Sequence, residues 1–282
     1  MHPLSDSLKE SFRADLHCHS SFSDGSMSPE ELIDLAIVSG LQGLSITDHD
    51  TIDAYKSAIP YAKEKGLVLG TGVELSCEYK KKSVHILGYN FSPEDQSLIQ
   101  YCQRQQQKRT KRNQEILEKL KRLRILLTEE ELLLDCPDAS SVGRPHIAAL
   151  MMKKGHVRSI QEAFQLYIGD GACCFVRGEL FPVKEALAII RAAGGKTFLA
   201  HPHLYSDAGF VKEILSLGFD GIECFYGKFS YRYEKTWLKI AKESHLLISG
   251  GSDYHGSVKS YLSLGCSYVD QEVFSSIFTE KN

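Results

Sequence analysis

Three features are scarce in this chain, and each scarcity excludes a class of protein. Its 282 residues contain no apolar run near the roughly 20 residues that a membrane-spanning helix needs, so we expect no membrane partner. Its net charge is only −3, which does not predict stable binding of duplex nucleic acid. Its eight cysteines show no CxxC spacing and follow no signal-like leader, which favours reduced thiols in a cytoplasmic protein.

The sequence instead alternates strand-like and helix-like segments, with 43% hydrophobic residues to supply a large core. Helices are predicted over residues 28–40, 51–65, 182–193, 208–217 and 231–244, and strands over 67–69, 83–87, 197–200, 221–225 and 246–249. Repeated strand–helix units predict an α/β fold with a parallel barrel that is incomplete or distorted.

Residues 93–178 lack this alternation and are predicted to be an inserted, mainly helical subdomain. We therefore expect a first barrel part over residues 1–92, an insertion covering the active site over 93–178, and a second barrel part over 179–282. A long helix is predicted over residues 100–127, with Ile116, Leu120, Leu123 and Leu127 on its apolar face. When this apolar face is continued toward the N-terminus in steps of three or four residues, it reaches Arg112 and Arg109, with Asn113 beside them. These side chains should therefore face inward.

A second short signal in the insertion is the run Gly143-Arg144-Pro145-His146. Proline suits the first position of a helix, which places Arg144 and His146 at a helix start. Such a start can bind an anion, although it is also a common way to begin a helix.

Histidines and carboxylates recur at or just past the ends of the predicted strands. In an extended strand His17 and His19 share a face while Cys18 points the other way into packing. The full set is His17, His19, Asp24, His49, Glu74, His85, His201, Asp253 and His255. Such groups are costly to bury unpaired, so their gathering on one rim predicts a metal site.

This set of ligands predicts two or three divalent cations, because nine side chains are too many for one ion. Imidazoles and carboxylates without thiolate favour Mn²⁺, Fe²⁺ or Zn²⁺, and Mn²⁺ is our first choice. Ions about 3.5–4 Å apart can hold a hydroxide and polarise a phosphoryl group, which suits phosphoester hydrolysis.

At this point the motifs resemble a known family, the polymerase-and-histidinol-phosphatase (PHP) family. The matching runs are Asp15-Leu16-His17-Cys18-His19-Ser20, Ser23-Asp24-Gly25, Thr47-Asp48-His49-Asp50, Gly72-Val73-Glu74, His85, Ala200-His201-Pro202 and Gly251-Ser252-Asp253-Tyr254-His255-Gly256. The resemblance spans nearly the whole chain. It implies a distorted seven-stranded β/α barrel, similar to a TIM barrel, with a trinuclear metal centre on its rim.

The resemblance also implies roles for these residues. His17, His19, Glu74 and Asp253 would hold one ion, Asp24, His49 and His255 a second, and His85 and His201 a third, with Glu74 bridging. The catalytic residues would be His17, Asp24, His49, Glu74, His201 and His255, and a metal-bridging hydroxide would attack phosphorus. A metal-bound water or a histidine on the rim would protonate the leaving oxygen.

Within the family, the insertion and the run from Gly143 to Ala148 resemble a subgroup of nucleotide phosphoesterases. Its members convert 3′,5′-bisphosphonucleotides, such as 3′-phosphoadenosine 5′-phosphate, to 5′-mononucleotides, and some also trim short RNA from its 5′ end. A substrate with two phosphates needs an anion pocket away from the metals. The residues predicted to build it are Arg109, Arg112, Asn113, Arg144 and His146.

The sequence is also compatible with three other functions. A histidinol-phosphate phosphatase would act on a monophosphate and would leave the basic insertion unexplained. A 3′→5′ proofreading nuclease would need a groove for a long strand, for which the sequence gives little support. A catalytically inactive metal- or nucleotide-binding module would be expected to have lost ligands, because unused buried carboxylates oppose folding.

Overall fold

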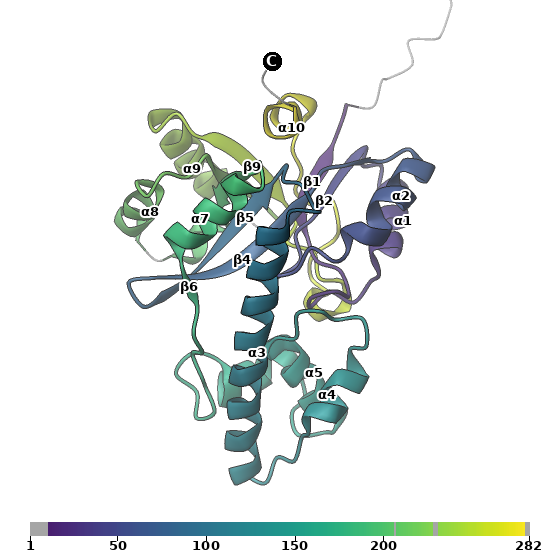
Figure 1. The fold of residues 1–282 in the computed structure, drawn as a ribbon, viewed down its shortest axis with the longest axis vertical. Coiled ribbons are helices and arrows are strands. Elements are labelled where there is room, and N and C mark those ends of the chain that lie inside the picture. Colours follow the sequence, from purple (N-terminus) through teal and green to yellow (C-terminus); the bar gives the residue numbers. More distant parts are fainter. Residues whose placement is uncertain (1–10, 206, 228–230, 280–282) are drawn as a thin grey trace, which may run out of the picture.

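The strands of this chain form two hydrogen-bonded sheets with helices packed around them (Figure 1). The computed structural model describes residues 11–205, 207–227 and 231–279. The first sheet has the order β1 (Ala14–Cys18), β2 (Gly43–Ile46) and β3 (Val68–Leu69), all parallel. The second has the order β6 (Phe181–Pro182), β4 (Gly72–Tyr79), β5 (Lys82–Tyr89), β7 (Lys196–Leu199), β8 (Gly221–Tyr226) and β9 (Leu247–Gly251). The fold is thus mixed α/β with parallel strands.

Strand β5 runs antiparallel to both of its neighbours, which corrects the expectation of an all-parallel strand arrangement. The reason is local: β4 and β5 are joined by a tight hairpin, with Tyr79 paired to Lys82, so no helix crosses between them. Isolated parallel bridges connect the two sheets, one between Cys18 and Tyr254 and one between His49 and Glu74. The strand ends of both sheets therefore lie side by side at these bridges.

Helix α1 (Pro29–Val38) begins as the sequence predicts. The Ser28 hydroxyl accepts a hydrogen bond from the Glu31 amide, and the Glu31 carboxylate accepts one from the Ser28 amide. Helix α2 (Tyr55–Lys65) starts four residues later than predicted, because Thr51 and Asp53 bond to each other in a turn. It ends, as predicted, at Gly66 in the left-handed conformation.

The remaining helices of the sheet region flank the larger sheet (Figure 1). They are α7 (Val183–Ala192), α8 (Ala208–Leu215), α9 (Tyr231–Glu243) and α10 (Gln271–Phe278), with short turns η2 (Pro202–Leu204) and η3 (Gly256–Lys259). Cys18 lies in the main hydrophobic core, as its predicted packing role requires. No helix in the described ranges is long and apolar enough to span a bilayer.

Residues 93–178 contain helices and no strand in the structure. The long helix α3 (Gln96–Arg122) is followed by α4 (Glu129–Asp135), α5 (Arg144–Lys153), α6 (Ile160–Ala163) and the π-helical turn η1 (Phe164–Ile168). This segment has its own hydrophobic cluster, which includes Ile116, Leu120 and Ile147. Helix α3 is shifted toward the N-terminus of the predicted range, and Leu123, just past its end, is 49% exposed.

Gly72 permits close contact between the two sheets where β2 faces β4. A Cβ there would lie 2.2 Å from Ser45 Oγ and 2.9 Å from Thr47 Cγ2, and both of these residues are buried. We expect Gly72→Ala to destabilise the protein by about 1–3 kcal/mol through overpacking.

Thermal unfolding measures this effect, and Gly209→Ala in helix α8 is the control. The atoms nearest to a Cβ there belong to the exposed Asp207 side chain, at 3.2–3.6 Å, and this side chain can turn away, so alanine should change Tm much less. An unchanged Tm for Gly72→Ala would contradict the close approach.

Candidate metal centre

The ends of the strands bring all nine predicted metal-ligating side chains together. His17 lies in β1, His19 just after it and Asp24 in the following turn. The others come from the ends of β2 (His49), β7 (His201) and β9 (Asp253 and His255), and from within β4 (Glu74) and β5 (His85). The sequence analysis was wrong only about the position of Glu74, which lies inside strand β4, a strand that we did not predict.

Glu74 is at the centre of the cluster, with its two oxygens facing different histidines. Oε2 lies 3.2 Å from the Nε2 atoms of His17 and His19 and 3.4 Å from His49 Nδ1. Oε1 lies 2.7 Å from His85 Nδ1 and 2.8 Å from His201 Nε2. One carboxylate is thus positioned to be shared between neighbouring cations.

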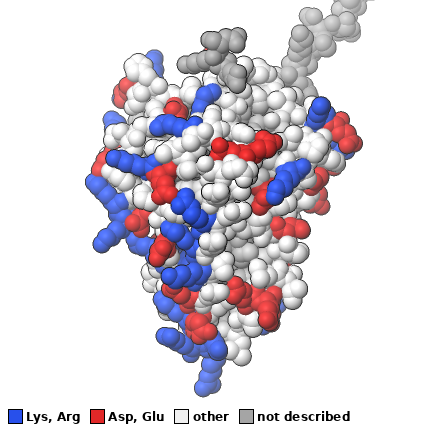
Figure 2. Space-filling view, in the orientation of Figure 1, with Lys and Arg blue, Asp and Glu red and all other residues white. Residues whose placement is uncertain are grey.

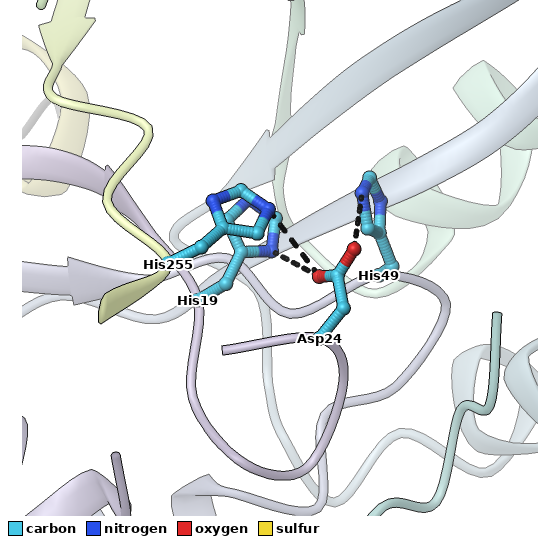
Figure 3. Close-up of side chains that lie close together, drawn as sticks. All are labelled: His19, Asp24, His49 and His255. Carbon is cyan, nitrogen blue, oxygen red and sulfur yellow. Dashed lines mark ion pairs between the residues drawn. The ribbon is translucent and has the colours of Figure 1, made fainter. Parts of the chain in front are cut away.

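Asp24 is the centre of a second group, formed with His19, His49 and His255 (Figure 3). Its Oδ1 lies 3.3 Å from His255 Nε2 and 3.7 Å from His19 Nδ1, and its Oδ2 lies 3.9 Å from His49 Nε2. The ring centroids of His19 and His255 are 4.0 Å apart. His19 therefore faces Asp24 with one nitrogen and Glu74 with the other.

The donor atoms of this cluster fit divalent cations. Both ring nitrogens of His19, Asp24 Oδ1 and His49 Nδ1 are buried and have no hydrogen-bond partner among the residues that the structure describes. Buried polar atoms are rarely left unpaired without a functional reason. The ligand atoms fall into three groups that could each hold an ion: His19, Asp24, His49 and His255; His17, His19, Glu74 and Asp253; and His49, Glu74 and His85.

Electrostatics within the cluster favour ionised carboxylates. Burial opposes ionisation of Glu74, but His49, His85 and His17 outweigh it and hold its pKa well below the ordinary value. Burial, together with His19 and His85, holds the pKa of His49 well below its ordinary value, although Glu74 and Asp24 oppose this. His17 behaves differently: burial lowers its pKa, but Glu223, Glu74 and Asp253 outweigh burial and raise it well above the ordinary value. The carboxylates are thus in the anionic form that ligates a metal, and a bound cation would take over the charge that protons on the imidazoles otherwise supply.

Two buried carboxylates next to the cluster, Glu223 and Asp48, hold the ligands in position. Glu223 Oε1 lies 2.7 Å from His17 Nδ1, and its Oε2 accepts a hydrogen bond of 2.6 Å from the His201 amide. The sequence analysis did not single out Glu223, although an acidic residue inside the apolar strand 221–225 is a signal that it has a partner. Asp48 accepts hydrogen bonds from Ser20 and Ser23 and so fixes the turn that carries Asp24.

Asp253 has two further partners that the sequence did not reveal. Lys259 Nζ lies 2.7 Å from Asp253 Oδ2, and the Tyr226 hydroxyl donates to the same oxygen at 2.6 Å. Oδ1 remains directed at His17 and His19, at 3.4 and 3.2 Å. These contacts fix the rotation of the Asp253 carboxylate.

A pocket of about 600 Å³ extends from the cluster toward the helical segment. Its lining includes Asp24, His49 and His255 from the cluster, and Arg109, Arg112 and Arg144 from α3 and α5. Arg109 pairs with Asp50 and donates to Ser76 Oγ at 2.8 Å, and Arg144 pairs with Asp170 at 3.0 Å. Within the described ranges, no carboxylate lies at ion-pair distance from Arg112, and its Nε makes no hydrogen bond.

Among the described residues, the Arg112 guanidinium therefore has no counter-ion, and it donates one hydrogen bond of 3.0 Å to Asn113 Oδ1. Burial, with Arg109 and Arg144 nearby, lowers its pKa to about 9. A bound anion would relieve both the desolvation and the repulsion, so this end of the pocket suits a phosphate.

Two of the five predicted substrate-binding residues do not line this pocket. Asn113 donates to the Val142 carbonyl at 3.0 Å, and His146 Nδ1 accepts from the Gly143 amide at 3.0 Å. Both contacts hold the loop that precedes Arg144. Their position gives them a structural role in placing Arg144.

Comparison with known proteins agrees with this geometry. The chain is 36% identical over 251 residues to a 5′-3′ exoribonuclease from Haemophilus influenzae, covering 86% of this chain and 89% of the relative. It is 28% identical over 246 residues to a 3′,5′-nucleoside bisphosphate phosphatase from Chromobacterium violaceum, covering 86% of each. A solved structure from Bifidobacterium adolescentis, named as a candidate metal-dependent phosphoesterase, superposes with a TM-score of 0.86 at 27% identity and 94% coverage of both chains.

The chain is accordingly a hydrolase that acts on phosphoester bonds, and its cluster of histidines and carboxylates suits divalent cations. The PHP domain family matches residues 15–172, which is more than half of the sequence, and together with the relatives this shows that the chain belongs to the PHP family.

Proposed function

We propose that this protein removes the 3′-phosphate of nucleoside 3′,5′-bisphosphates, and trims short 5′-phosphorylated RNA from its 5′ end by the same cleavage. The observation that carries the proposal is one pocket lined both by residues of the metal-ligand cluster and by Arg112, which has no carboxylate partner among the described residues. A substrate with two phosphates on one nucleoside matches these two parts of the lining. Relatives named for each activity support both parts.

We assign the nine clustered side chains as ligands of two or three divalent cations, with Mn²⁺ preferred and Fe²⁺ or Zn²⁺ as alternatives. His17, His19, Glu74 and Asp253 would hold one ion, Asp24, His49 and His255 a second, and His85 and His201 a third that shares Glu74. When bound, the cations would supply an activated water and polarise the phosphoryl group.

The chain's own residues orient this chemistry. Glu223 holds Nδ1 of His17, so that Nε2 points at Glu74 and Asp253. Arg112 and Arg144 would grip the phosphate that is not cleaved, which places the other phosphate at the cluster. Arg109 has a different task, because its pairing with Asp50 ties helix α3 to the loop after β2.

We further propose that the two sheets are parts of one distorted seven-stranded barrel interrupted by an insertion over residues 93–178. The bridges between Cys18 and Tyr254 and between His49 and Glu74 support a closed ring of β1, β2, β4, β5, β7, β8 and β9. The separate hydrophobic cluster of the helices supports the insertion. Its arginines in the pocket support its place over the active site.

A substrate panel tests the proposal directly. With Mn²⁺ present, kcat/KM should be highest for 3′-phosphoadenosine 5′-phosphate, with measurable release of 5′-mononucleotides from short 5′-phosphorylated RNA. Histidinol phosphate should be a poor substrate, because it has no second phosphate for Arg112. A preference for histidinol phosphate would overturn the assignment, and tight metal binding with no phosphate release would indicate an inactive binding module.

The metal assignment predicts the effect of Asp253→Asn. Replacing a residue that only hydrogen-bonds to a metal ligand typically lowers metal affinity roughly 10–100-fold, and loss of a charged ligand should lower it by at least as much. We expect kcat to fall in parallel. Metal content after dialysis, measured by elemental analysis, follows this effect.

Asp53→Asn is the matched control, because Asp53 is also a carboxylate close to the site but pairs with Lys56 outside the cluster. Wild-type metal content in Asp253→Asn would argue against its role as a ligand.

Arg112→Ala and Arg144→Ala should each raise KM for a bisphosphonucleotide roughly 10–100-fold, the equivalent of one hydrogen bond to a charged group. KM for a simple aryl phosphate should change much less, because that substrate has no second phosphate. Arg122→Ala, at the exposed end of α3, is the control and should behave as wild type. Equal effects on both substrates would remove the second anion pocket from the proposal.

A further inference from the structure

The lining of the pocket includes a second group of cations, which are exposed to solvent. Lys81 lies in the turn of the β4–β5 hairpin and Lys82 is the first residue of β5, whereas Arg177 lies in the segment that leads from the helices back to β6. All three line the pocket and are exposed. We call Lys81, Lys82 and Arg177 the basic rim. In Figure 2, Lys and Arg side chains gather along the edge of the molecule where this hairpin projects in Figure 1.

The basic rim is held together by its backbone. Lys80 and Lys81 are the two turn residues, with φ of 49° and 61°. Residues other than glycine and asparagine rarely adopt this left-handed backbone conformation. The Arg177 guanidinium donates a hydrogen bond to the Lys81 carbonyl and thereby joins the hairpin to the returning segment. Three cations from two distant parts of the sequence are thus fixed on one side of the pocket.

The charges of the basic rim are not neutralised by the protein. In the part of the chain that the structure describes, no carboxylate lies at ion-pair distance from Lys81, Lys82 or Arg177, and Lys82 Nζ lies 4.4 Å from the centre of the Phe210 ring. Neighbouring Lys80 differs, because it pairs with Glu213 and does not line the pocket. Glu78 and Asp170 are the acids that line the pocket outside the cluster, and Asp170 pairs with Arg144.

The two basic regions differ in burial, which suggests different ligands. Arg112 is only partly exposed and Gly178, the residue after Arg177, packs against its side chain, so this part of the pocket suits a small group that ends, as a terminal phosphate does. The basic rim is open to solvent, so a chain that continues beyond the metal cluster can leave the pocket there. A bisphosphonucleotide stops at its 3′-phosphate, whereas in RNA that phosphate carries the next nucleotide.

We propose that the basic rim binds the backbone phosphates of the nucleotides downstream of the cleaved bond in a single-stranded oligoribonucleotide. This inference rests on the proposed function, because it assumes that the 5′-terminal nucleotide occupies the pocket. Lysine and arginine along an open groove suit such a strand, since they attract phosphates without selecting a base. The site thus has separate contacts for the terminal nucleotide and for the strand that follows.

The test compares Lys81→Ala/Lys82→Ala and Arg177→Ala with Lys80→Ala and wild type. The substrates are 3′-phosphoadenosine 5′-phosphate and a 5′-phosphorylated pentaribonucleotide, and kcat/KM is measured at several salt concentrations. The double variant should lower the value for RNA at least about tenfold more than the value for the bisphosphate. Its salt dependence on RNA should weaken by about 0.7 in log–log slope for each phosphate that no longer has a cationic partner.

Lys80→Ala is the matched control, because it removes a lysine from the same hairpin that faces Glu213. It should match wild type on both substrates. Tm values show whether each variant folds. The lysine variants should stay within about a degree or two of wild type. Arg177→Ala also loses the hydrogen bond to the Lys81 carbonyl, so its kcat/KM is measured well below its own Tm.

Equal losses on both substrates, or none on RNA, would overturn the basic rim while leaving the phosphatase proposal intact. Wild-type protein that cleaves the bisphosphate but no RNA would do the same. Wild-type protein that cleaves neither substrate with Mn²⁺ would overturn the proposed function and this inference together.

Discussion

The structure depends on one buried carboxylate, Glu74, and on the five imidazoles that surround it at 2.7–3.4 Å. At 1% exposure, this carboxylate is unfavourable to bury unless nearby charge compensates for the lost water. The imidazoles come from β1, β5 and the ends of β1, β2 and β7, so the compensation requires that both sheets are formed and joined. Formation of the site and the joining of the two sheets are therefore one constraint.

Three residues of the site have a strained backbone conformation, and hydrogen bonds within the site stabilise it. Asp50, His201 and Asp253 have φ of 54°, 29° and 55°, a conformation that costs of order 1–3 kcal/mol for each such residue. The amide of each donates a short hydrogen bond within the site: Asp50 to the Glu74 carbonyl, His201 to Glu223 and Asp253 to the His17 carbonyl, at 3.0, 2.6 and 2.7 Å. The strained turns place side chains that a relaxed strand end would point elsewhere.

The sequence predicted which residues lie at the strand ends, but it did not predict all of the strands around them. Histidine and acid at strand ends were visible because strand periodicity and residue type are local properties, and the same holds for the cap of α1 at Ser28. Strand β4 was missed although Glu74, Ser76 and Glu78 alternate with apolar residues as in an ordinary strand, because Glu74 was interpreted only as a ligand that follows the strand predicted over 67–69. The reversal of β5 also escaped, since the hairpin turn Lys80-Lys81 lacks the glycine or asparagine that usually marks one.

Long-range pairing explains why the helical segment could be predicted only in part. The inward face of α3 was visible from its periodicity, yet Arg109, Arg112 and Asn113 have different environments because of partners far along the chain. Asp50 forms an ion pair with Arg109, and the Val142 carbonyl accepts a hydrogen bond from Asn113. Arg112, in contrast, has no carboxylate partner among the described residues. In the anion site that we propose, Arg112 remains available because Arg109 pairs with Asp50 and Arg144 pairs with Asp170. Removing the anchor at Asp50 would free Arg109 but also release the helix that positions Arg112, so structure and recognition cannot be varied independently here.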